Sequence, residues 1–134
     1  MKEDLKCIML IDDNPDDNFF HEREIKKCNA SLNVITKMSG LEALEYLKSM
    51  KKIEQPKPEL IFLDINMPGM NGWEFLKEYN LLDNELKKKP VIIMLTTSDN
   101  PDDIARAMQI GFVSDYITKP LTNEKVKSIC VKYF

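Results

Sequence analysis

Carboxylates, a hydroxyl and a lysine stand directly after short apolar runs of the sequence. These side chains are Asp12 and Asp13, Asp64, Thr96 and Lys119. Three carboxylates cannot all be ionised side by side unless their pKa values rise or a cation joins them, and ligation by oxygen alone selects a hard ion such as Mg²⁺. Thr96 would add a hydroxyl donor and Lys119 a movable positive charge. If these residues converge, they form a site suited to a metal ion and a phosphoryl group.

The elements that must position these groups alternate regularly along the chain. Short apolar, β-branched runs predict five strands, at residues 6–11, 33–38, 60–63, 91–95 and 115–117. Amphipathic stretches predict five helices, at residues 15–28, 40–50, 72–79, 101–110 and 122–132. The near-unbroken apolarity of several of the runs is typical of strands that are covered on both faces.

A β-α unit repeated in this way predicts an α/β fold, with a five-stranded parallel sheet, right-handed crossovers and helices on both faces. In such a sheet, ligands bind at the carboxyl ends of the strands, near the point where the strand order reverses. With the strand order 2-1-3-4-5, the first, third and fourth strands are neighbours. Asp12, Asp13, Asp64 and Thr96 would then lie at one edge of the sheet, in a single site.

Capping signals mark the starts of three helices. Asn14-Pro15-Asp16-Asp17 recurs as the tetrapeptide at residues 100–103. Both copies fit an Asn N-cap, a Pro at the first helical position and acids at the positive end of the helix dipole. The segment 39–42, Ser-Gly-Leu-Glu, fits a capping box.

Each candidate site residue also has an ordinary structural interpretation. Asp12 and Asp13 could begin a turn, Asp64 could be a turn acid, and Thr96 could satisfy the backbone at a strand end. Lys119 could be a solvated lysine. The joint placement of these residues after successive strands favours the functional interpretation.

Composition and charge limit the class of protein. The chain has 134 residues, of which 43% are hydrophobic and 31% are charged, which suits one globular domain over residues 1–134 with no separate output domain. A net charge of −3 disfavours nucleic acid as a partner. No apolar run approaches the ~20 residues that span a bilayer, and three widely spaced cysteines suit reduced packing residues, so we expect a cytoplasmic protein without a membrane partner.

Four segments together resemble the receiver domains of two-component response regulators, in particular the chemotaxis type. The segments are MLIDDN at 9–14, LDINMPGMNG at 63–72, MLTTS at 94–98 and DYITKP at 115–120. The resemblance covers essentially the whole chain. It implies a flavodoxin-like receiver fold with the strand order given above.

The resemblance also implies a metal-dependent phosphoacceptor. Asp64 would receive the phosphoryl group. Asp13, Asp64 and the backbone carbonyl of Asn66 would ligate Mg²⁺, and Asp12 would hold water molecules of the ion.

Further residues would bind the phosphoryl group and report its presence. Lys119, Thr96 and the backbone N–H groups of Asn66 and Thr97 would contact phosphoryl oxygens. Thr97 is larger than the Ala or Gly that is common there, which would narrow access. Tyr116 would be the aromatic switch that turns inward as the Thr96 hydroxyl moves. The family also has a cis bond before the proline of its Lys-Pro pair, here at 119–120.

These roles describe a signalling protein that catalyses its own aspartyl phosphorylation and dephosphorylation. The donor would be a sensor histidine kinase or a phosphotransfer protein in two-component signalling or a phosphorelay. Output would pass to a downstream protein through the face formed by the fourth helix, the fifth strand and the fifth helix, at residues 101–110, 115–117 and 122–132. Asn66 and Ser98 would set the lifetime of the acyl phosphate.

Three other functions compete with this one. An aspartyl-phosphate phosphatase would need a second acid two residues after Asp64, where Asn66 stands. A flavodoxin would cradle phosphate in its first loop, whereas Asp12, Asp13 and the acids that follow them repel an anion. A phosphorylation-independent interaction module would not require the full acceptor set. His21, which could suggest a phosphocarrier, is interpreted as a packed helix residue.

Overall fold

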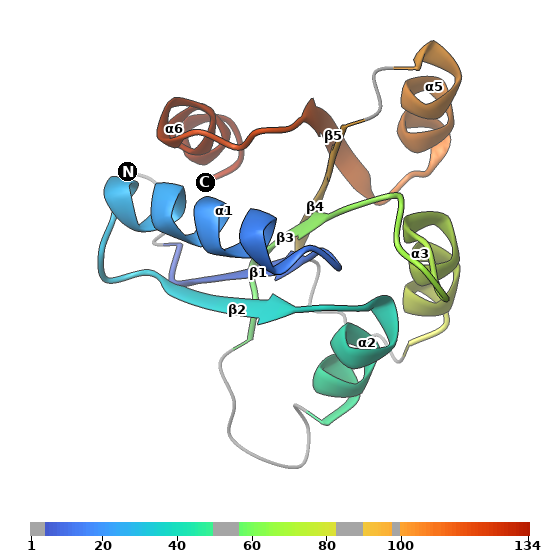
Figure 1. Cartoon of the computed structure of the whole chain (residues 1–134). Coiled ribbons are helices and arrows are strands. Elements are labelled where there is room, and N and C mark those ends of the chain that lie inside the picture. Colours follow the sequence, from blue (N-terminus) through green and yellow to red (C-terminus); the bar gives the residue numbers. More distant parts are fainter. Residues whose placement is uncertain (1–4, 50–56, 83–89, 98–99) are drawn as a thin grey trace.

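The computed structural model describes residues 5–49, 57–82, 90–97 and 100–134, which form a five-stranded parallel sheet with helices on both sides (Figure 1). The strands are β1 (Cys7–Ile11), β2 (Asn33–Lys37), β3 (Leu60–Leu63), β4 (Val91–Thr96) and β5 (Val113–Thr118). The described helices are α1 (Pro15–Cys28), α2 (Gly40–Ser49), α3 (Gly72–Asn80), α5 (Pro101–Gln109) and α6 (Asn123–Tyr133). The strand order β2-β1-β3-β4-β5 confirms the predicted α/β fold and its topology.

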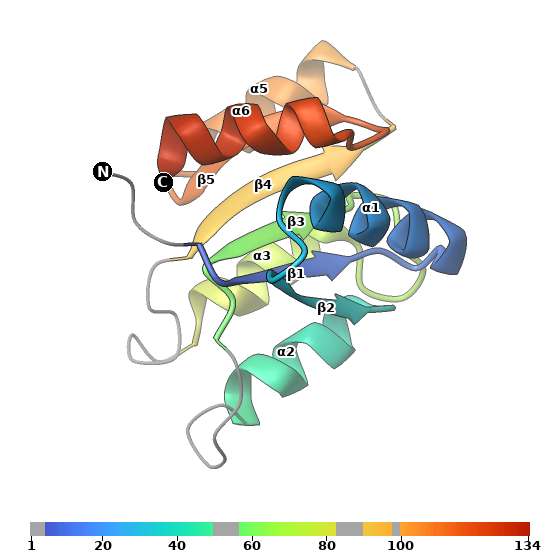
Figure 2. The same cartoon turned by 90° about the vertical axis from the view of Figure 1, so that its left-hand side faces the viewer.

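The helices cover both faces of the sheet because the strands are apolar on both sides. Figures 1 and 2 show α1 and α6 on one face and α2, α3 and α5 on the other. Successive residues of β1 serve opposite cores: Met9 packs with residues of α2, α3 and α5, and Leu10 packs with residues of α1 and α6. Both side chains are at most 1% exposed. Burial on two sides explains the unbroken apolar runs of the central strands.

The predicted helix starts at Asn14 and Asn100 are confirmed. The side chain of Asn14 accepts hydrogen bonds from the backbone N–H groups of Asp16 and Asp17, at 2.9 and 3.3 Å. The side chain of Asn100 accepts one from the N–H of Asp102, at 2.8 Å. Each cap satisfies N–H groups that the first helical turn leaves without an intrahelical acceptor.

The predicted capping box at α2 is only half formed. The Glu42 N–H donates to the Ser39 hydroxyl at 3.1 Å, but the Glu42 carboxylate accepts from the Met38 N–H, at 3.0 Å, one residue before the cap. A complete box, which the sequence analysis did not predict, caps α3 between Asn71 and Glu74. It fixes the start of the helix that follows the Asp64 loop.

Strand β5 is longer than the predicted 115–117 because it contains an irregularity. Ile92 of β4 lies opposite Val113, and Ile93 lies opposite Asp115, so Ser114 is an extra residue in the pairing. A bulge of this kind breaks the alternation by which strands are recognised.

In the part of the chain that the structure describes, no helix has the length and apolarity needed to cross a bilayer.

Candidate functional site

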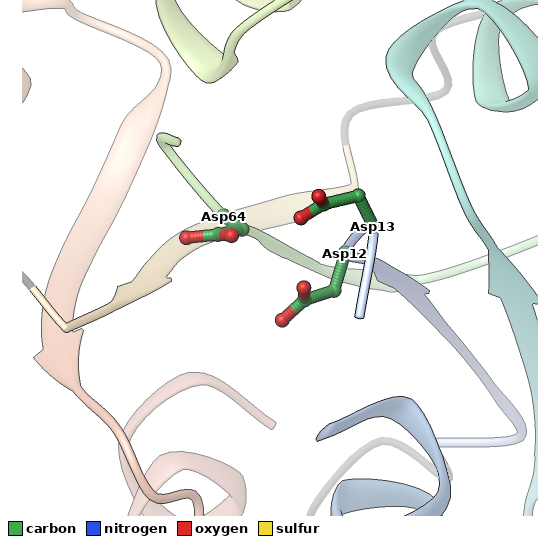
Figure 3. Close-up of side chains that lie close together, drawn as sticks. All are labelled: Asp12, Asp13 and Asp64. Atoms are coloured by element: carbon green, nitrogen blue, oxygen red, sulfur yellow. The ribbon is translucent and has the colours of Figure 1, made fainter. Parts of the chain in front are cut away.

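Three carboxylates converge at the carboxyl ends of β1 and β3 (Figure 3). Ligand oxygens of Asp12, Asp13 and Asp64 all lie within 4.8 Å of one another. Asp12 and Asp64 are only 4% and 6% exposed. Two buried anions this close together repel each other, so the cluster has the charge and the donor atoms of a site for a hard divalent cation.

Backbone hydrogen bonds hold these residues in place by continuing the sheet past the strand ends. The Asp12 N–H donates to the Lys37 carbonyl at 3.1 Å, and the Asp64 N–H donates to the Ile11 carbonyl at 3.0 Å. The Lys119 N–H donates to the Thr96 carbonyl at 2.8 Å. The register of the parallel sheet therefore fixes the relative positions of the site residues.

The Lys119 ammonium lies among the acids. Its Nζ atom is 2.6 Å from Asp12 Oδ2, 2.8 Å from Asp17 Oδ2 and 3.7 Å from Asp64 Oδ2. Thr96 and the Asn66 backbone N–H also act on Asp64, because both lower the pKa of its carboxyl by favouring the charged form. Asp64 thus has a cation and two neutral donor groups beside it, the groups that a phosphoryl oxygen on this residue would need.

Burial shifts the pKa values in this site. Burial raises the pKa of the Asp64 carboxyl above its ordinary value. Lys119 opposes this shift, Asp12 adds to it, and the neighbouring donor groups of Thr96 and Asn66 also oppose it. Burial alone would lower the pKa of Lys119, but the close ion pairs with Asp12 and Asp17 and the attraction of Asp64 raise it. Lys119 therefore stays charged, whereas ionisation of Asp64 is less favourable in the folded protein than in water.

The other residues expected at the site lie around this centre. Asn66 follows Asp64 in the loop after β3 and is exposed, and Thr97 is exposed at the end of β4. Tyr116 is half-buried on β5, opposite Met94, and packs against the core beneath α3 and α5. The Lys119–Pro120 peptide bond is cis, as the resemblance implied. Ser98 lies outside the described residues.

Asp17 is a site residue that the sequence analysis missed. We interpreted it as an acid at the start of a helix, and its N–H is indeed capped by Asn14. Its carboxylate also reaches Lys119, 102 positions later in the chain. The sequence contains no spacing signal for a contact of this kind.

His21 lies beneath the site and is not a surface phosphocarrier. Its side chain is buried, with the residue 2% exposed, so a phosphodonor has no access to it. Burial lowers its pKa; the nearest charges act in both directions, with Asp17 raising it and Lys119 lowering it. The interpretation of His21 as a packed helix residue is confirmed.

We expect Asp64→Asn to stabilise the metal-free protein at neutral pH. Because the pKa of Asp64 is raised in the folded state, folded protein binds more protons than unfolded protein between the ordinary and the raised value, and stability falls as the pH rises through that window. The neutral amide removes this penalty and should raise the melting temperature.

Thermal unfolding in the presence of EDTA measures this effect. The difference between the variant and the wild type should disappear at acidic pH, where Asp64 is protonated in both states. A variant that melts below the wild type at neutral pH would show that the ion pair with Lys119 outweighs the burial of the charge.

Comparison with known proteins identifies the class to which this fold and site belong. The family model of the response regulator receiver domain matches residues 8–130. This span contains the acid cluster, Thr96 and Lys119. The chain belongs to the response regulator receiver domain family of two-component signalling, which confirms the resemblance and the fold class.

Individual relatives agree in sequence and in structure. The response regulator Rcp1 of Synechocystis sp. is 34% identical over 115 residues, which are 85% of this chain and 76% of that protein. The crystal structure of a two-component response regulator from Cytophaga hutchinsonii has a TM-score of 0.86 at 29% identity and covers 97% of both chains. The Mn²⁺-bound form of response regulator Rcp1 has a TM-score of 0.68 at 28% identity and covers 93% of this chain and 88% of that one.

Some curated relatives are considerably longer than this chain. The chain spans 52% of one of them and 14% of another. The receiver domain is therefore a module that also occurs within larger proteins. Family membership establishes a response regulator receiver domain that is phosphorylated on an aspartate.

Proposed function

We propose that this chain accepts a phosphoryl group on Asp64 from a sensor histidine kinase or a phosphotransfer protein, in a reaction that depends on Mg²⁺. The observation that carries the proposal is the set of groups around one carboxylate. Asp64 lies with Asp12 and Asp13 and has the Lys119 ammonium at 3.7 Å, and Thr96 and the Asn66 backbone favour its charged form.

The residues present fit a hard divalent cation. The cluster and Asp17 together supply four carboxylates, and among the described residues Lys119 is the one cation paired with them, at Asp12, Asp17 and Asp64, so negative charge is in excess. Asp13, Asp64 and the Asn66 carbonyl would hold the ion, and Asp12 would hold its water molecules. The bound ion would neutralise charge at the reacting oxygens. The Mn²⁺-bound form of Rcp1 supports a divalent cation in this family.

The chain's own residues account for the remaining chemistry. An Oδ atom of Asp64 forms the bond to phosphorus as the P–N bond of a phosphohistidine donor breaks, and the electron pair of that bond leaves with the imidazole. The transition state is loose and carries its charge on the equatorial oxygens. Lys119, the Thr96 hydroxyl and the N–H groups of Asn66 and Thr97 would stabilise that charge. No general base is required because Asp64 is already an anion.

Asn66 distinguishes this function from that of an aspartyl-phosphate phosphatase. A phosphatase of that type needs an acid two residues after its nucleophile, and Asn66 is exposed at that position without a titratable group. Asn66 would instead influence how water reaches the acyl phosphate. We therefore infer that the chain dephosphorylates itself, and that its lifetime as a phosphoprotein depends on Asn66 and Ser98.

Incubation with a small phosphodonor, read by intact mass, tests the proposed function. The mass should rise by one phosphoryl group in Mg²⁺ and should stay unchanged in EDTA. Equal incorporation under both conditions would contradict the metal dependence. No incorporation under either condition would contradict the acceptor function.

The proposed output surface consists of α5, β5 and α6. On α5, Ile104 and Met108 are exposed hydrophobic residues, at 36% and 50%. Arg106 lies over the ring of Trp73, with its Cζ atom 4.3 Å from the ring centroid. A hollow of about 370 Å³ between β5 and α6 includes Tyr116 in its lining. Exposed apolar side chains together with a hollow on the same surface suit a protein partner, and the net charge of −3 gives no support for nucleic acid.

We expect phosphorylation to alter the output surface more than the opposite side of the sheet. Thr96 ends β4, and β5 pairs with β4 along its length, so a shift of the Thr96 hydroxyl is transmitted directly to β5. Amide chemical shift changes should concentrate in α5, β5 and α6. Changes of equal size in β2 and α2, at the other edge of the sheet, would contradict this output surface.

We expect Thr96→Ala to accept the phosphoryl group but to respond weakly to it. The hydroxyl acts on the Asp64 carboxylate and does not form the bond to phosphorus, so chemistry is retained while the contact that differs between the two states is lost. Phosphorylation-induced amide shifts around Tyr116 should shrink to a fraction of their wild-type size. Thr118→Ala, two residues beyond Tyr116 on β5, is the control. Full-size shifts in Thr96→Ala would rule out the switch role.

A further inference from the structure

The Lys119 ammonium has two carboxylate partners at hydrogen-bond distance, and one of them lies outside the acid cluster. Asp12 Oδ2 is 2.6 Å from the Nζ atom and belongs to the cluster. Asp17 Oδ2 is 2.8 Å away and comes from the first turn of α1. Asp64 is more distant, at 3.7 Å. The ammonium is thus shared between the proposed metal site and a residue beside it.

The start of α1 fixes the position of Asp17. Pro15 occupies the first helical position, and the Asn14 side chain accepts from the N–H groups of Asp16 and Asp17. Pro15 and the Asn14 cap therefore fix the backbone of the first turn of α1. Asp16 is exposed to solvent. The Asp17 side chain is partly covered, at 36% exposure, and contacts Lys119. Two neighbouring acids of equal charge thus occupy different environments.

A divalent cation in the cluster would compete with the ammonium for Asp12. The Lys119 side chain is only 10% exposed, so an ammonium displaced from Asp12 is poorly solvated unless another carboxylate takes it. Left beside the cation, it would also repel the ion. Asp17 offers a partner that is not among the cluster's ligands.

We propose that Asp17 is a positioning residue that takes over the Lys119 ammonium from Asp12 when a divalent cation binds, and that it thereby raises the metal affinity of the cluster. This inference rests on the proposed function, because it requires the metal site. It goes beyond that function by assigning a task to a fourth acid. Asp17 keeps the ammonium hydrogen-bonded and within reach of Asp64, where a phosphoryl group would need it.

The competing explanation is that Asp17 acts only as a nearby negative charge. A bare charge attracts a cation whether or not Lys119 is present. A positioning role depends on Lys119 and disappears with it. The two explanations therefore differ in a double-mutant cycle between positions 17 and 119.

Calorimetric titration with Mg²⁺ distinguishes them. Asp17→Asn should bind Mg²⁺ about five-fold more weakly than Asp16→Asn does, the factor expected from a partly exposed ion pair worth about 1 kcal/mol. Asp16→Asn is the matched control, because it removes the same charge from the same helical turn. Asp17→Glu, which keeps a carboxylate within reach of Lys119, should retain most of the affinity.

The same titrations in a Lys119→Met background complete the cycle. There, Asp17→Asn and Asp16→Asn should bind Mg²⁺ equally. A difference that persists without Lys119 would show that Asp17 acts as a charge, and would overturn the inference. Equal affinities of the two variants in the wild-type background would overturn it as well, while leaving the proposed function intact. A wild-type protein that binds no Mg²⁺ would overturn both.

Discussion

Asp64→Asn should abolish phosphoryl uptake, with no incorporated mass detectable under conditions that fully label the wild type. An amide has no anionic oxygen to form the bond to phosphorus. The neighbouring acids do not replace it, because Asp12 is paired with Lys119 at 2.6 Å and the donor groups of Thr96 and Asn66 act on residue 64. The donors that stabilise the transferred group are thus built around one position.

Asp102→Asn is the matched control for this experiment. Asp102 lies in the first turn of α5, in the Asn-Pro-Asp-Asp segment that repeats the segment at the start of α1. Its N–H is capped by Asn100, and its side chain is exposed. This variant should be labelled like the wild type. Labelling of Asp64→Asn, confirmed by peptide mapping at another aspartate, would refute the assignment of the acceptor.

The acid cluster could be predicted from the sequence because a parallel sheet imposes it. The carboxyl ends of neighbouring parallel strands share one edge, so acids that follow β1 and β3 meet there whatever loops connect them. The bonds from Asp12 to Lys37 and from Asp64 to Ile11 show this register continuing into the site. The strand order, together with the fact that each acid directly follows its strand, was sufficient to predict the cluster.

The contact between Asp17 and Lys119 could not be predicted in the same way. It depends on the angle at which α1 leaves the sheet and on the path of the chain after β5. Neither of these can be deduced from the spacing of residues along the sequence. The repeated Asn-Pro-Asp-Asp segment illustrates the difficulty. Both copies cap a helix, as predicted, yet only in the first is an ion pair with Lys119 found among the described residues.

Close packing around glycine was also beyond sequence reasoning. Gly72 begins α3 directly beneath the acceptor loop, and its N–H donates to the Ile65 carbonyl at 2.7 Å. A Cβ atom at Gly72 would lie 2.6 Å from the Asp64 carbonyl oxygen and 2.8 Å from the Ile65 Cα atom. Both are backbone atoms, which cannot rotate away as a side chain can.

Gly72→Ala should therefore destabilise the protein by about 1 to 3 kcal/mol, the range for an added group in a closely packed site. Relief of the clash requires α3 to move away from the acceptor loop or Asp64 to shift. Either movement also changes how the Asp64 carboxylate lies relative to Lys119 and Thr96, so phosphoryl uptake should slow in the protein that remains folded. Urea unfolding monitored by circular dichroism, together with labelling kinetics, measures both effects.

Gly111→Ala is the control that separates this clash from the general effect of replacing glycine. A Cβ atom at Gly111 would meet nothing within 4 Å. Alanine there restricts the unfolded chain without straining the folded one, so stability should be unchanged or should rise by up to about 1 kcal/mol. Gly72→Ala should thus lose stability, whereas Gly111→Ala should not. Equal stability of Gly72→Ala and Gly111→Ala would show that α3 is not held against the Asp64 loop, and the acceptor carboxylate would then owe its position to β3 alone.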